Sequence, residues 1–209
     1  MYEIFSSENL LEALLYALIS PALLVLLGLL IHYIDLFITN ALAGITNRTA
    51  AFVFRNYLTY PGTVHHELAH AIFATVTGAR VQKINLIPRG NRLGSVEFIT
   101  RGNIFFRAIQ LSLSAIAPVI CGATSLIVMI RYFLPMCTQA WHYIVFIYIF
   151  ISIFCHMTMS TQDIKNFLKG FPVCMLILFV IFLFIKPDLR AIIRNCYETG
   201  FIYFIGNAS

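Results

Sequence analysis

The stretch PGTVHHELAHA, residues 61–71, places three imidazoles and one carboxylate within six positions of a chain that is otherwise mostly apolar. Each of these groups costs free energy to bury without a partner. The order His66-Glu67-Leu68-Ala69-His70 puts two of the imidazoles one turn apart on the same face of a predicted helix. Two imidazoles at this spacing suit a single Zn²⁺, and Glu67 can then accept a proton from a metal-activated water. We therefore expect His66 and His70 to be zinc ligands and Glu67 to be a general base.

The composition around this motif is typical of an integral membrane protein. Of 209 residues, 60% are hydrophobic and 11% are charged, and the mean hydropathy is +0.85. Soluble domains carry about a quarter charged residues. About 20 apolar residues cross a bilayer, and we find apolar runs at 10–38, 51–79, 104–134, 140–157 and 167–185. The second run has an internal break at Pro61-Gly62, and Gly78 is the predicted stop of its helix. We expect an all-α polytopic protein of the cell membrane with about five transmembrane helices.

A short polar region follows the zinc-motif helix. VQKINLI (81–87) and LGSVEFI (93–99) alternate apolar and polar residues and flank the turn-rich PRGNR (88–92). This pattern predicts a small β-hairpin, which cannot face lipid. We divide the chain into an N-terminal transmembrane segment (1–50), a catalytic core (51–170), and a last transmembrane helix with an amphipathic C-terminal tail (171–209).

Charge and cysteine usage exclude several classes of protein. The net charge of +5 has no basic stripe with stacking aromatic residues, so we expect no nucleic-acid partner. The five cysteines show no C-x-x-C spacing, which argues against a disulfide framework and a thiolate zinc site. Eight of the 14 Lys and Arg residues lie at 80–107 and 165–169, and the positive-inside rule then favours a site near the cytoplasmic face.

The motif supplies two metal ligands, whereas catalytic zinc takes three from the protein and keeps one position open. Asp163 lies in the polar break TMSTQDIKN (158–166), although Ser160 and Asp163 also form a capping-box pattern that would start the next helix. His156 is its main rival. Interhelical hydrogen bonding is the simpler interpretation of Asp35, and His65, whose i+4 neighbour is Ala69, is expected outside the ligand set. The candidates for the third ligand are thus Asp35, Glu97, His142, His156 and Asp163.

The order of these features resembles the site-2 protease family of intramembrane zinc metalloproteases. The resemblance covers roughly residues 60–170: HELAH, then GARVQKINLIPRGNRLGSVEF, then a span with Ala117-Pro118, then an Asp after a further span. It implies that His66 and His70 bind zinc, that Glu67 is the general base, and that Asp163 is the third ligand. Ala117 stands where family members usually have Gly, and Asp163 lies in a Gln-Asp-Ile rather than a Leu-Asp-Gly setting, which suggests a divergent, small member.

The function we expect is a zinc metalloendopeptidase that hydrolyses peptide bonds of membrane proteins or membrane-proximal peptides, in or next to the bilayer. The alternative is a non-proteolytic zinc-binding membrane scaffold or regulator of the same architecture, because the chain is short. A metal transporter is a third class, but transport sites usually spread polar residues over several spans, and here most of the polar chemistry lies in one helix.

Overall fold

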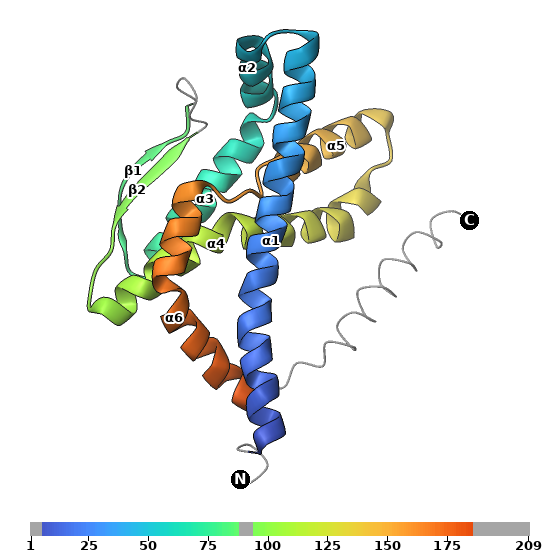
Figure 1. The fold of residues 1–209 in the computed structure, drawn as a ribbon. Coiled ribbons are helices and arrows are strands. Elements are labelled where there is room, and N and C mark those ends of the chain that lie inside the picture. The colour runs from blue at the N-terminus through green and yellow to red at the C-terminus, as the bar shows by residue number, and fades with distance from the viewer. Residues whose placement is uncertain (1–5, 88–93, 186–209) are drawn as a thin grey trace. The chain divides into compact units, whose positions relative to one another are not determined.

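The computed structural model describes residues 6–87 and 94–185. Its helices are α1 (Ser7–Ile45), α2 (Arg48–Leu58), α3 (Tyr60–Val76), α4 (Ile104–Val128), α5 (Ala140–Cys155) and α6 (Thr161–Phe184). A π-helical turn, η1 (Met129–Phe133), and a 3₁₀ turn, η2 (Leu134–Met136), extend α4. Strands β1 (Arg80–Asn85) and β2 (Ser95–Ile99) lie between α3 and α4 (Figure 1). The fold is therefore mainly helical with one small sheet, as expected.

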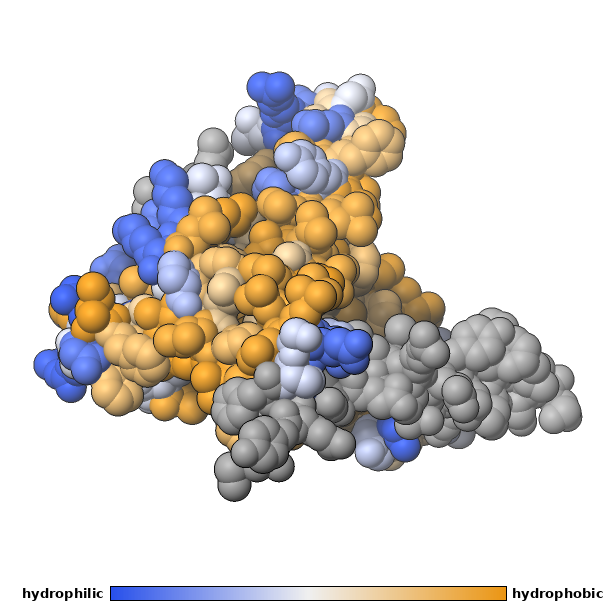
Figure 2. Space-filling model, turned by 60° about the horizontal axis from the view of Figure 1, so that its bottom comes forward, coloured by the Kyte–Doolittle hydropathy of each residue, from blue (hydrophilic) through white to orange (hydrophobic). Residues whose placement is uncertain are grey.

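Three of the described helices are long and apolar enough to cross a membrane. They are α1, the continuous run Ile104–Met136, and α6. On the face drawn in Figure 2, most of the described side chains are hydrophobic. These features are compatible with a membrane protein, but the expected count of about five spans is not confirmed. The fourth apolar run forms α5, which has only 16 residues.

The second expected span is two helices rather than one. The sequence predicted a run over 51–79 with an internal break at Pro61-Gly62, whereas α2 ends at Leu58 and α3 begins at Tyr60. Pro61 lies in the first turn of α3, where its missing N–H has no intrahelical partner to lose. The break therefore falls at Thr59, and the motif lies on a separate 17-residue helix.

The hairpin is confirmed and is fixed at the end of α3. Strands β1 and β2 pair antiparallel, with Lys83 opposite Glu97. Gly78, the predicted helix stop, has φ +91, and the amides of Gly78 and Ala79 bond to the carbonyls of Thr75 and Ala74. The expected turn at 88–92 and the expected amphipathic tail beyond residue 185 lie outside the described residues.

By contacts, the chain divides into two compact units: the described parts of Met1–Ile19 with Met175–Ser209, and Ser20–Cys174. The second unit contains every predicted site residue. In it, α3 packs against α4, α5 and the hairpin. Close approaches are made at glycines: a Cβ at Gly62 would lie 1.9 Å from the Ser152 carbonyl oxygen of α5, and one at Gly170 would lie 2.1 Å from the Ala108 oxygen of α4. These crossings bring the start of α6 to the middle of α3.

Candidate metal centre

The two motif imidazoles face each other on α3. Their ring centroids are 4.7 Å apart and their Nε2 atoms are separated by 3.1 Å. This follows from the i, i+4 spacing, which places His66 directly one turn before His70 on one face of the helix. His70 is buried, and both rings line one cavity of about 930 Å³.

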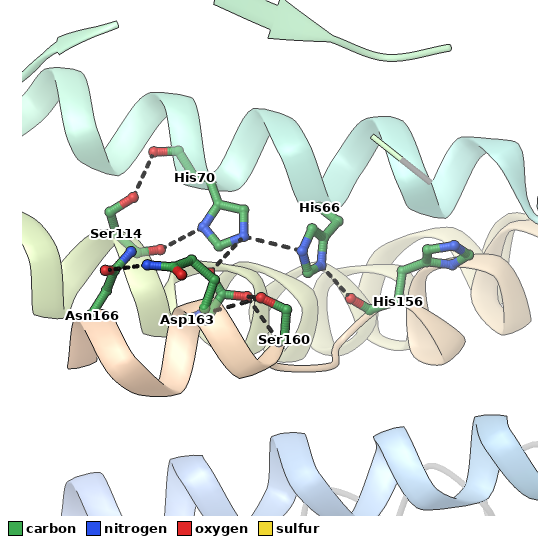
Figure 3. Close-up of polar contacts among 8 residues, drawn as sticks. His66, His70, Ser114, His156, Ser160, Asp163 and Asn166 are labelled. Atoms are coloured by element: carbon green, nitrogen blue, oxygen red, sulfur yellow. Dashed lines mark hydrogen bonds and ion pairs between the residues drawn. The ribbon is translucent and has the colours of Figure 1, made fainter. Parts of the chain in front are cut away.

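The other nitrogen of each ring is bound to a backbone carbonyl. His66 Nδ1 lies 2.7 Å from the His156 oxygen, and His70 Nδ1 lies 2.7 Å from the Ser114 oxygen (Figure 3). Because a carbonyl can only accept, each Nδ1 carries the proton that it donates. Burial together with the adjacent His70 ring lowers the pKa of His66 well below its ordinary value. The Nε2 atom of each ring is left facing the other ring.

Asp163, on the first turn of α6, completes the group. Its Oδ1 lies 3.6 Å from His70 Nε2, and one ligand atom from each of His66, His70 and Asp163 lies within 4.8 Å of the others. The other oxygen, Oδ2, accepts from the Ser160 amide at 2.8 Å and from the Ser160 hydroxyl at 2.6 Å. The Asp163 amide donates back to Ser160 Oγ at 3.2 Å. The carboxylate thus caps α6 with one oxygen and turns the other toward the imidazoles.

This arrangement fits a divalent cation. Two imidazole nitrogens and a carboxylate oxygen converge here, and a positive ion among them could bind all three. Two His nitrogens with one carboxylate oxygen form a set that zinc accepts with one position left open. A metal-binding imidazole usually donates its other ring N–H to a carbonyl, a carboxylate or a water, as both rings do here. His66, His70 and Asp163 are therefore the residues that could hold a metal.

Glu67 lies beside this group without belonging to it. Its side chain is 6% exposed and lines the same cavity. A Cβ at Gly94, where the chain enters β2, would lie 2.8 Å from Glu67 Oε1, so the hairpin backbone covers the carboxyl group. Glu67 is outside the three candidate spans, and burial and the Asp163 carboxylate raise its pKa to about 7. Such a carboxyl can take up and release a proton near neutral pH.

The rival imidazoles lie elsewhere. The His156 ring bonds to Thr63 Oγ1 at 3.0 Å and to the Ser152 oxygen at 2.9 Å, so the side chain is not part of the group. His65, as expected, lies outside it, with its Nε2 2.9 Å from Ser125 Oγ. His142 accepts from the amide of Gln139 at the start of α5.

The other two candidate carboxylates, Asp35 and Glu97, lie outside the group and face other residues. Asp35 receives a bidentate hydrogen bond from Arg55, including 2.7 Å from Arg55 Nε to Asp35 Oδ1, and this confirms an interhelical role between α1 and α2. Glu97 is on β2, opposite Lys83. Asp163 is therefore the carboxylate that the structure brings to the two motif histidines.

Sequence reasoning missed the two carbonyls that orient the imidazoles. Neither the Ser114 nor the His156 oxygen belongs to a motif, because every residue has a carbonyl. A weak signal for Ser114 was present: Gln110 and Ser114 are four positions apart in an apolar helix, and both are buried.

A comparison with protein-family models, curated proteins and solved structures found no match.

Proposed function

We propose that this chain is a membrane-embedded zinc metalloprotease that hydrolyses peptide bonds in or next to the bilayer. The observation that carries the proposal is the convergence of the two Nε2 atoms and an Asp163 oxygen, with both Nδ1 atoms bonded to backbone carbonyls. Glu67 beside this group is the general base. The motif resembles that of site-2 proteases, which supports the same reaction.

Each side chain has a separate task in this reaction. When bound by His66, His70 and Asp163, a zinc ion would supply an acidified water and polarise the scissile carbonyl. Glu67 takes the proton of the attacking water and returns it to the leaving amine. Burial and the Asp163 carboxylate raise the pKa of Glu67 to about 7. The hairpin backbone at Gly94 lies against the Glu67 side chain and restricts its conformations.

The membrane sets the form of the substrate. A peptide bond within a helix has its carbonyl hydrogen-bonded and shielded, so a membrane-spanning substrate must unwind locally to be cut. The cavity that holds the motif also has Thr39, Asn40 and Arg48 on its walls, so exposed peptide groups would find polar partners there. We infer that the substrate is a membrane protein or membrane-proximal peptide, cut near the cytoplasmic face.

The test is the zinc content and the proteolytic activity of the detergent-purified protein beside those of His66→Ala. We expect about one zinc per wild-type chain, none in the variant, and cleavage only in the wild type. Equal zinc in both would remove the metal site. Stoichiometric zinc without cleavage of any membrane-protein substrate would instead favour a scaffold or regulator.

A further inference from the structure

The His156 ring lies outside the group formed by His66, His70 and Asp163, and both of its nitrogens make hydrogen bonds. Nδ1 lies 2.9 Å from the Ser152 carbonyl oxygen, one turn earlier in α5, and Nε2 lies 3.0 Å from Thr63 Oγ1 of α3. Since a carbonyl only accepts, Nδ1 carries the proton and Nε2 is the acceptor. The Thr63 hydroxyl therefore donates to His156. With both nitrogens used, the ring has none left for a metal or a substrate.

The same residue also supplies the acceptor for the first zinc-motif histidine. The His156 carbonyl oxygen lies 2.7 Å from His66 Nδ1. His156 is the C-terminal cap of α5, with φ −104 and ψ 5, so its carbonyl has left the helical ladder and has no intrahelical partner. Its direction depends on how His156 is held: the His156 amide donates to the Ile153 oxygen at 3.0 Å, and the ring makes the two bonds described above.

We propose that Thr63 and the His156 ring are positioning residues for His66. Thr63 donates to the ring, the ring donates to Ser152, and this pair of bonds sets the carbonyl that orients the imidazole of His66. Thr63 is 1% exposed and His156 is 4% exposed, so both bonds are largely shielded from bulk water. The proposal deepens the proposed function and rests on it.

The crossing of α3 and α5 supports this assignment. The Gly62 amide donates to Ser152 Oγ at 2.8 Å, and that hydroxyl donates to the Thr59 oxygen at 2.9 Å. The acceptor of the His156 ring is thus itself fixed to the start of α3. Thr63, one residue later, comes from the same helix as the ligand that it orients. A shift of His156 would therefore move its carbonyl relative to His66 without moving α3.

Matched variants at Thr63 test the proposal. Thr63→Val keeps the shape of the side chain but has no hydroxyl, whereas Thr63→Ser keeps the hydroxyl. Loss of the group that orients a metal-binding histidine weakens metal affinity by about 10–100-fold, and Thr63 acts on that group, the His156 carbonyl, through the His156 ring. We expect Thr63→Val to bind zinc about tenfold more weakly, by chelator competition in detergent, and Thr63→Ser to bind like the wild type. The visible spectrum of the Co²⁺ form should change in Thr63→Val only.

A second variant separates positioning from general damage. His156→Phe keeps a ring of similar size and the backbone carbonyl but removes both ring bonds, and it should weaken zinc binding at least as much as Thr63→Val. The double variant should be no weaker than His156→Phe, because both changes break the same bond. Additive losses, or equal zinc affinity for Thr63→Val and Thr63→Ser, would overturn the proposal.

The outcomes also distinguish this proposal from the proposed protease. Zinc affinity that falls in Thr63→Val, in a protein whose wild type binds zinc but cleaves no membrane-protein substrate, supports positioning and overturns proteolysis. Unchanged zinc affinity in Thr63→Val with cleavage retained overturns positioning and leaves the protease intact. A wild-type chain that binds no zinc overturns both.

Discussion

At the scale of single residues, the two carboxyl groups of the site, those of Asp163 and Glu67, are held in different ways. Asp163 is tied by Ser160 so that one oxygen faces the imidazoles, whereas Glu67 lies beside the group under the hairpin backbone. A ligand must stay ionised and fixed, while a base must exchange a proton. The two positions suit the roles proposed for them, Asp163 as ligand and Glu67 as base.

Glu67→Gln should keep zinc and lose proteolysis. The amide has nearly the same shape as the carboxyl group, and residue 67 is not one of the three converging donors. Removal of a general base usually lowers the rate by about 10²–10⁴-fold. The measurement is the cleavage rate of a membrane-protein substrate alongside zinc per chain. Cleavage at the wild-type rate would show that Glu67 is not the base.

Asp163→Asn and Ser160→Ala should separate the two tasks of the Asp163 carboxyl group. The asparagine can still accept from the Ser160 amide but has no charge for the metal, so zinc should be lost while the start of α6 is kept. Ser160→Ala keeps the carboxylate and removes the hydroxyl that accepts from the Asp163 amide, so zinc should stay while stability falls by about 0.5–2 kcal/mol. Zinc analysis and unfolding in detergent measure both. Full zinc in Asp163→Asn would reduce Asp163 to a cap.

The residues that could be predicted are those whose side chains form a recognisable motif at close spacing in the sequence. His66, Glu67 and His70 follow from one helical spacing, and Asp163 from a polar break and a family resemblance. The sequence left two interpretations of Asp163 open, a helix cap and a zinc ligand. Both are compatible, because Oδ2 accepts from Ser160 while Oδ1 faces His70. The carbonyls that orient the imidazoles could not be predicted, since main-chain acceptors leave no mark in the sequence.

At the scale of elements, the position of the site depends on the close crossing of α3 and α5. Gly62 and Ser152 meet there, and the backbone after α5 then reaches His66. The sequence predicted the Pro61-Gly62 pair as a break within one span. Its actual role is different: Pro61 opens α3, and Gly62 allows α5 to come close. The backbone preferences of proline and glycine predict a break at Pro61-Gly62, but they do not show that α5 packs closely against Gly62.

Gly62→Ala should therefore destabilise the protein and weaken the metal site. Its Cβ would lie 1.9 Å from the Ser152 oxygen, so α5 must move. Such overpacking typically costs about 1–3 kcal/mol. Gly44→Ala on α1 is the matched control, because a Cβ there meets nothing within 4 Å and alanine favours a helix. Thermal unfolding in detergent should show a loss for Gly62→Ala and none for Gly44→Ala; equal midpoints would contradict the crossing.

At the scale of the whole molecule, the metal group joins segments far apart in the chain. His66 and His70 come from α3, and Asp163 comes from the first turn of α6, beyond the hairpin, α4 and α5. The described helices include three that are able to cross a membrane, and the site draws on one of these and on the shorter α3. A bound ion would therefore act on the packing of the unit Ser20–Cys174 as well as on the reaction.

Zinc should accordingly raise the unfolding temperature of the whole protein. An ion that binds only the folded chain stabilises it by about 2.7 kcal/mol at a free concentration of 100 times its Kd. We expect phenanthroline to lower the midpoint of thermal unfolding in detergent, and added zinc to restore it. For a chain of this length, each kcal/mol corresponds to about 2–4 °C. The midpoint and the cleavage rate should recover over the same range of zinc concentration.

Asp163→Asn provides the control for this whole-molecule effect. Without the carboxylate charge the α3 and α6 donors no longer share an ion tightly, so neither phenanthroline nor zinc should move the midpoint of the variant. Its own midpoint should lie near that of the chelated wild type, because the Ser160 cap of α6 is retained. An equal drop on chelation in both proteins would mean that zinc stabilises the chain at some other place. In that event the His66, His70 and Asp163 group would not be the site that holds the fold together.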